Sequence, residues 1–101
     1  MLNELIAARL DVGLGYWRDK AGHEVDFVLG QPGQPPVAIE CKWSAGAFEV
    51  RNLRAFRNRY PAGSNFVVVP GLPQPYRQRM GALEIQFESL ESLIQRLHGL
   101  P

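Results

Sequence analysis

Two apolar segments of the chain are interrupted by acidic and basic side chains at regular spacing. Asp26 lies within residues 23–29, and Glu40 and Lys42 lie two residues apart within residues 37–43. Both segments have the composition of strands, in which residues i and i+2 point to the same side of the sheet. If the two strands are neighbours, the three side chains converge. Burying such charges is costly unless they are paired or bound to a metal ion, so the pattern indicates a site.

The chemistry of this group is that of a divalent metal centre. Mg2+ binds through one or two carboxylates and keeps several water molecules, which leaves room for a phosphate group. The sequence therefore predicts phosphodiester hydrolysis, in which Asp26 and Glu40 hold Mg2+, with Mn2+ as a substitute. Lys42 would orient the attacking water or stabilise the charge that develops in the transition state. The alternative for Glu40 and Lys42 is a surface ion pair on a solvated strand face.

A second acid lies close to Asp26. Alternation along the strand predicts that Glu24 and Asp26 share one face. The apolar residues of that segment are predicted on the opposite face, namely Val25, Phe27 and Leu29. Glu24 is either a third ligand or a partner of Arg18 across a hairpin.

These residues also carry a resemblance to known families. EVDFVL at 24–29, followed by IECK at 39–42, resembles the D-x(n)-ExK signature of the PD-(D/E)xK nuclease superfamily, although Val25 replaces the proline of its PD element. With YWRD at 16–19 and Gly22, the chain more closely resembles the uncharacterised domain that follows AAA-type ATPase modules in many bacterial and archaeal proteins. The chain itself has no GxxxxGK[ST] phosphate-binding loop.

The resemblance implies specific roles and a fold. It carries metal ligation onto Asp26 and Glu40 and the catalytic lysine onto Lys42, and it suggests Glu4, in the first helix, as an additional acid near the metal. Glu4 also has the ordinary interpretation of a first-turn glutamate favoured by the helix dipole. The implied fold is α/β, a restriction-endonuclease-like α-β-β-β-α-β core with a mixed central sheet flanked by helices.

Periodicity and turn residues predict the same order of elements, extended by a C-terminal strand and helix. The expected helices span residues 2–10, ending near Gly13 and Gly15, then 47–60, and a last one capped by Ser89 that runs to about His98. The expected strands span residues 16–19, 23–29, 37–43, 65–69 and 83–87, with a turn at 19–22 and loops at 31–36 and 70–82. A chain of 101 residues is expected to form a single domain over 1–101.

The predicted partner is DNA. The net charge of +1 neither indicates nor excludes it, so the positions of the basic residues must decide. Arg51, Arg54 and Arg57, in the helix over 47–60, are candidate contacts to the phosphate backbone, and a solvated helix face is the alternative. Four large aromatic residues are interpreted as core or hinge packing rather than base-stacking platforms, namely Trp17, Trp43, Phe48 and Tyr76. A homodimer would suit the cutting of two strands.

A function of another class fits the same sequence. A catalytically inactive nuclease-like module would bind nucleic acid or serve as the assembly domain of an AAA-type ATPase. No stretch approaches the ~20 apolar residues that span a bilayer, so no membrane contact and a cytoplasmic location are expected. The single cysteine, Cys41, agrees with a reducing compartment.

Overall fold

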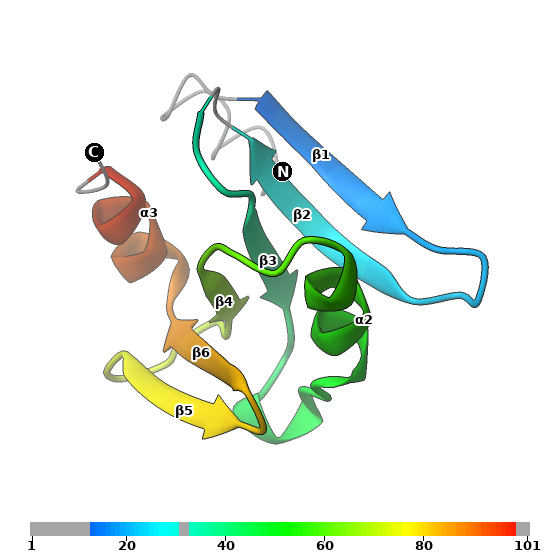
Figure 1. Ribbon diagram of the computed structural model, residues 1–101. Helices are drawn as coiled ribbons and strands as arrows, with labels where there is room; N and C mark the ends of the chain where they lie inside the picture. The colour runs from blue at the N-terminus through cyan, green and yellow to red at the C-terminus, as the bar shows by residue number, and fades with distance from the viewer. Residues whose placement is uncertain (1–12, 31–32, 99–101) are drawn as a thin grey trace.

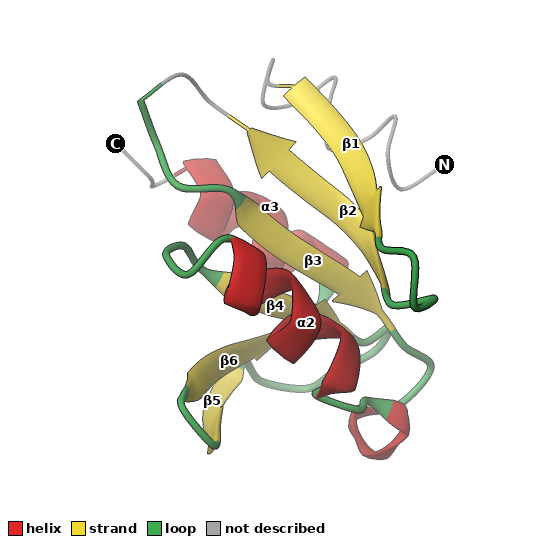
Figure 2. Cartoon of the chain, turned by 45° about the vertical axis from the view of Figure 1, so that its right-hand side comes forward, coloured by secondary structure: helices red, strands yellow, loops and turns green. Residues whose placement is uncertain are grey.

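The computed structural model describes residues 13–30 and 33–98, which form a mixed sheet of six strands with a helix on each face (Figures 1 and 2). The strands are β1 (Gly13–Arg18), β2 (Glu24–Gly30), β3 (Val37–Cys41), β4 (Asn65–Val68), β5 (Tyr76–Met80) and β6 (Leu83–Glu88). The helices are α2 (Arg51–Arg59) and α3 (Leu90–His98), with a short 3-10 helix η1 (Ala45–Ala47) before α2. The expected α/β class is confirmed. The helix predicted over 2–10 lies outside the described residues.

The sheet has the order β1-β2-β3-β4-β6-β5. Strands β1, β2 and β3 form an antiparallel meander, and β4 is parallel to β3 because α2 carries the chain back between them. Strand β6 is parallel to β4, and β5 pairs antiparallel with β6 at the sheet edge. Three parallel strands therefore end at the same side of the molecule.

Two apolar clusters cover the two faces of the sheet. Leu53 and Phe56 of α2 pack against one face, and Leu93 and Leu97 of α3 against the other, so the helices lie on opposite sides (Figure 2). All residues of β4 are buried, as the continuous apolar run predicted. Along β3 the side chains alternate as expected, with Ala38 on the α2 face and its neighbours on the α3 face.

The last helix begins as predicted. The Ser89 hydroxyl accepts a hydrogen bond from the Ser92 backbone N–H at 3.2 Å, and the Ser92 hydroxyl accepts one from the Ser89 backbone N–H at 2.9 Å. This reciprocal cap satisfies donors at the start of α3. Neither described helix is long and apolar enough to cross a membrane.

The predicted starts of one strand and one helix were wrong. Strand β1 begins at Gly13 rather than Tyr16, because the glycine-containing segment pairs with the end of β2. Helix α2 begins only at Arg51, because residues 45–47 form η1 and Phe48 packs edge-on against Phe87 at 5.8 Å.

The segment 70–82, expected to be irregular, contains β5. This edge strand carries mostly exposed side chains, so it lacks the apolar alternation that reveals a half-buried strand. Its pairing with β6 is reinforced by Tyr76, whose ring stacks on Phe87 at 4.7 Å.

Candidate active site

The structure brings Asp26, Glu40 and Lys42 together at the carboxyl end of β3. The Cys41 backbone N–H, which lies between Glu40 and Lys42, donates a hydrogen bond of 2.9 Å to Oδ2 of Asp26. Asp26 and Lys42 also both act on the pKa of the Glu40 carboxyl. The convergence predicted from strand alternation is therefore present in the fold.

A β-bulge in β2 places Asp26. Gly15 pairs with Val28, and Trp17 with Val25, so two steps along β1 oppose three along β2. The extra residue changes the faces: Val25 joins the cluster under α2, whereas Phe27 joins the cluster under α3. The prediction that Val25, Phe27 and Leu29 share one face was wrong for Val25, because the bulge breaks the alternation.

Glu40 is the buried member of the group. The residue is 2% exposed, and its Oε2 atom has no hydrogen-bond partner among residues 13–30 and 33–98. Burial raises the pKa of the Glu40 carboxyl to about 7, the Lys42 ammonium opposes that rise, and the Asp26 carboxylate adds to it. A buried carboxyl oxygen without a partner is rare in folded proteins and calls for a ligand or a proton.

Lys42 lies just beyond β3, where its backbone N–H donates to the Val68 carbonyl at 3.0 Å. It lines a hollow of about 590 Å³ formed where β3, β4 and β6 end and α3 begins. Ligands of open α/β sheets bind outside the carboxyl ends of parallel strands. Trp43, in the same hollow, is 89% exposed, so the expectation that it packs in the core was wrong, because β3 ends before it.

The donor set fits a Mg2+ ion with few protein ligands. Asp26 is exposed and Glu40 has an oxygen that no described residue hydrogen-bonds, so each offers a carboxylate oxygen. Within residues 13–30 and 33–98 there is no group of three or more histidine, cysteine, aspartate or glutamate side chains that could hold a metal. The described residues thus provide two carboxylates, a number that Mg2+ accepts when water completes its shell. Glu4, the further predicted ligand, lies outside the described residues.

Glu24 and the predicted basic residues lie elsewhere. Arg18 Nε and Glu24 Oε1 are 3.5 Å apart on the exposed hairpin, as the pairing alternative required. Arg51 and Arg54 are exposed on α2, but Arg57 is 5% exposed. The guanidinium of Arg57 donates to backbone carbonyls and to Asn65 Oδ1, so the expectation that Arg57 contacts a phosphate backbone was wrong.

A buried acid in β6 was missed from the sequence. Glu88 is 1% exposed, and its Oε2 accepts a hydrogen bond of 2.9 Å from Arg96 Nε. Its Oε1 has no partner in the part of the chain that the structure describes. Glu88 follows Phe87 at the end of an alternating strand, where alternation predicts a solvated side chain. Its side chain meets α3 through the bond to Arg96, a contact that the local alternation does not reveal.

Comparison with known families supports one of the two resemblances. The model of the family described as domain of unknown function (DUF4143) matches residues 1–87. The chain belongs to this family. DUF4143 is an uncharacterised domain often found with AAA ATPases, which confirms the closer resemblance seen in the sequence. The matched part of this DUF4143 chain contains Asp26, Glu40 and Lys42, and α3 lies beyond it. No curated protein matches the chain.

Proposed function

We propose that this DUF4143 domain hydrolyses phosphodiester bonds of DNA in a Mg2+-dependent reaction. The observation that carries the proposal is the Oε2 atom of Glu40, which is buried near Asp26 and Lys42 and has no hydrogen-bond partner among the described residues. Leaving such an atom unsatisfied costs about 1–3 kcal/mol, a cost that a bound cation would remove. Perturbed carboxyl groups next to a basic residue are typical of functional sites.

The strand order supports this proposal. The meander β1-β2-β3, the helix α2 and the parallel strand β4 follow the β-β-β-α-β order that the PD-(D/E)xK resemblance implies. In that order the ExK segment spans the end of β3 and the residue after it, and β3 is next to the acid-bearing strand β2. We therefore infer a restriction-endonuclease-like core for this domain.

The three side chains have separate roles. Asp26 and Glu40 would hold the ion, which when bound supplies a Lewis acid for the phosphate and acidifies water. Glu40 must lose its proton to serve as a ligand, and a pKa of about 7 leaves this loss within reach at neutral pH. The Lys42 ammonium is positioned to stabilise negative charge on the phosphate oxygens as the bond breaks.

A cleavage assay tests the proposal. Labelled single-stranded and duplex DNA would be incubated with the domain in Mg2+, in Mn2+ and in excess chelator. We expect cleavage with either metal, none with chelator, and none for Lys42→Ala purified in the same way. Equal cleavage by wild type and Lys42→Ala would refute the role of Lys42. No cleavage of any substrate by the folded wild type would refute hydrolysis.

The oligomeric state of the domain determines whether one or both strands of a duplex are cut. Cutting both strands of a duplex calls for two active sites, so we propose a homodimer for that substrate. Analytical ultracentrifugation with and without duplex DNA tests this. A monomer that nicks one strand would limit the activity to single-strand cleavage.

A second candidate function is assembly with an AAA-type ATPase, without catalysis. It is favoured by the exposed Trp43 at the mouth of a largely apolar hollow, because tryptophan is enriched at the centre of protein interfaces. Size-exclusion chromatography with an ATPase module to which such a domain is joined would test it. Co-elution that Trp43→Ser abolishes and Trp43→Phe retains would support assembly, whereas equal co-elution of both variants would contradict it.

A further inference from the structure

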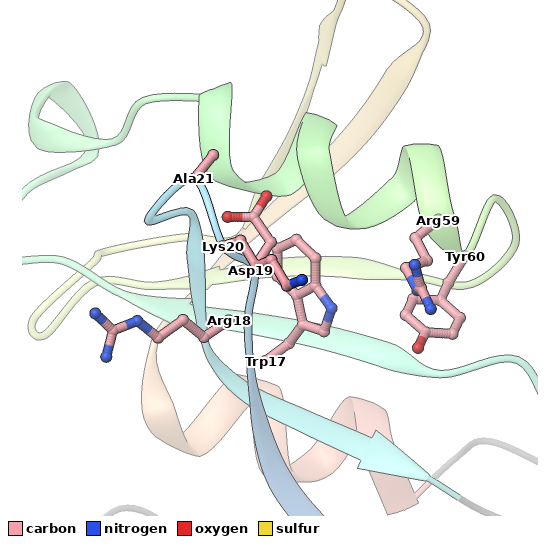
Figure 3. Close-up of a pocket in the computed structure, with 7 residues that line it drawn as sticks. All are labelled: Trp17, Arg18, Asp19, Lys20, Ala21, Arg59 and Tyr60. Atoms are coloured by element: carbon pink, nitrogen blue, oxygen red, sulfur yellow. The ribbon is translucent and has the colours of Figure 1, made fainter.

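A second hollow lies away from the proposed metal centre. It has a volume of about 750 Å³ and separates the β1–β2 hairpin from the C-terminal end of α2 (Figure 3). Hairpin residues 17–21 line one side, and Arg59 and Tyr60 line the other. None of the three proposed catalytic residues lines it.

Two aromatic rings, those of Trp17 and Tyr60, line this hollow, and both pack against Phe56. Trp17 meets Phe56 edge to face at a centroid distance of 5.3 Å, and Tyr60 lies against Phe56 at 5.1 Å. Figure 3 shows the Trp17 indole between the hairpin and the Arg59–Tyr60 pair. Trp17 is half-buried and Tyr60 is 40% exposed, so the rings are fixed on one side and open on the other.

The charge around the rings is positive. Lys20 and Arg59 are exposed, and neither forms an ion pair with another described residue. Asp19, the acid among the lining residues, already interacts with His23. Its Oδ1 accepts a hydrogen bond of 2.8 Å from the His23 backbone N–H, and its Oδ2 lies 2.7 Å from His23 Nδ1. Arg18 points away from the rings (Figure 3).

We infer that this hollow binds an unpaired nucleic-acid strand, with bases stacked on Trp17 and Tyr60 and phosphates on Lys20 and Arg59. Open aromatic faces beside unpaired cations are what a single strand requires, since its bases are free to stack and its backbone is anionic. In a duplex the base faces are already covered by neighbouring bases. An acidic peptide would use the cations but leave both rings without a partner. The inference does not depend on the proposed hydrolysis.

Binding is measured by fluorescence anisotropy with a short labelled oligothymidine in excess chelator, so that metal-dependent cleavage plays no part. We expect the double variant Lys20→Gln, Arg59→Gln to have a shallower slope of log K against log salt concentration. The slope should change by about 1.4, or ~0.7 for each lost phosphate contact. Both side chains are exposed, so the fold should persist. The matched control is Arg77→Gln with Arg79→Gln on β5, which removes the same charge outside the hollow and should leave the slope unchanged.

The aromatic contribution is tested separately. Tyr60→Leu keeps an apolar contact to Phe56 but removes the π face, so affinity should fall about tenfold, while Tyr60→Phe should bind as wild type. Trp17 fluorescence should also be quenched by the strand. The inference fails if the hollow variant and the β5 control change the slope equally, or if Tyr60→Leu binds as tightly as wild type. Wild-type binding by Lys42→Ala, together with loss of cleavage, would separate this hollow from the proposed hydrolysis.

Discussion

The carboxylate of Asp26 accepts a hydrogen bond of 2.9 Å from the backbone N–H of Cys41. The two residues lie on neighbouring strands, and Cys41 separates Glu40 from Lys42. The bond therefore holds the exposed Asp26 carboxylate close to the buried Glu40. Its donor is a backbone N–H of β3, so its position does not change with side-chain motion. One oxygen of Asp26 is used in this way, and the other is left for a ligand.

Asp26→Asn should keep this bond, since the amide oxygen also accepts, while it removes the charge. Mn2+ affinity should fall by about tenfold or more. The melting temperature in metal-free buffer should stay constant or rise slightly, because repulsion with Glu40 is relieved. Titration calorimetry and thermal unfolding measure the two effects, and a large loss of metal-free stability would make Asp26 a structural residue.

Lys42→Ala should abolish metal-dependent cleavage and leave folding nearly unchanged, because the ammonium acts on the transition state. It should also raise the pKa of Glu40 further, since the Lys42 charge holds that pKa down. Gel assays of cleavage and carboxyl titration by NMR check these expectations. Arg79→Ala, on the remote edge strand β5, is the matched loss of one positive charge and should cleave as wild type.

Glu40→Gln should change how stability depends on pH. The pKa of Glu40 is raised from 4.5 to about 7 in the folded state, so between these values the folded protein binds more protons than the unfolded one. Wild-type stability from this group is therefore full below pH 4.5 and is lost as pH rises to about 7, by up to roughly 3 kcal/mol. The neutral glutamine should remove that decline. Denaturant unfolding at a series of pH values measures it, and parallel curves for the two proteins would contradict the assignment.

The thiol of Cys41 should react slowly. Burial, and then the charges of Asp26 and Glu40, raise the pKa of this thiol to about 11. Since the thiolate is the reactive form, alkylation by iodoacetamide at pH 8 should be on the order of 100-fold slower than for free cysteine. Asp26→Asn should speed the reaction by removing one negative charge. Alkylation of the native protein at the rate of free cysteine would show that this environment is absent.

Arg57→Ala should be strongly destabilising. The side chain donates to Asn65 Oδ1 at 2.8 Å and to the carbonyls of Pro36 and Ser64 at 3.0 and 2.8 Å, which joins α2 to the starts of β3 and β4. Removing it leaves buried acceptors unpaired, so the free energy of unfolding should fall by about 3 kcal/mol or more. Exposed Arg54, one turn earlier, is the control, and Arg54→Ala should change stability by less than ~0.5 kcal/mol. Equal effects of the two substitutions would contradict the structural role of Arg57.

The sequence was sufficient for the central features of this domain. Alternation in the segment 37–43 predicted which residues of β3 share a face, and the run at 65–69 predicted a strand buried on both sides. The ExK spacing, with the acid at Asp26, was enough to expect the convergence at the end of β3. These features depend on local periodicity, which the sequence records directly.

Tertiary structure decided the features that depend on pairing and packing. The bulge near Asp26 arises where the register between β1 and β2 shifts by one residue. Strand β5 forms because its backbone pairs with the edge of β6. The same helix holds the buried Arg57 and the exposed Arg54, which the sequence cannot distinguish because both are arginines within one amphipathic pattern. Burial of a polar side chain is set by neighbours distant in the chain, so Glu40 and Arg57 became recognisable as buried charges only once β3, α2 and β4 were packed together.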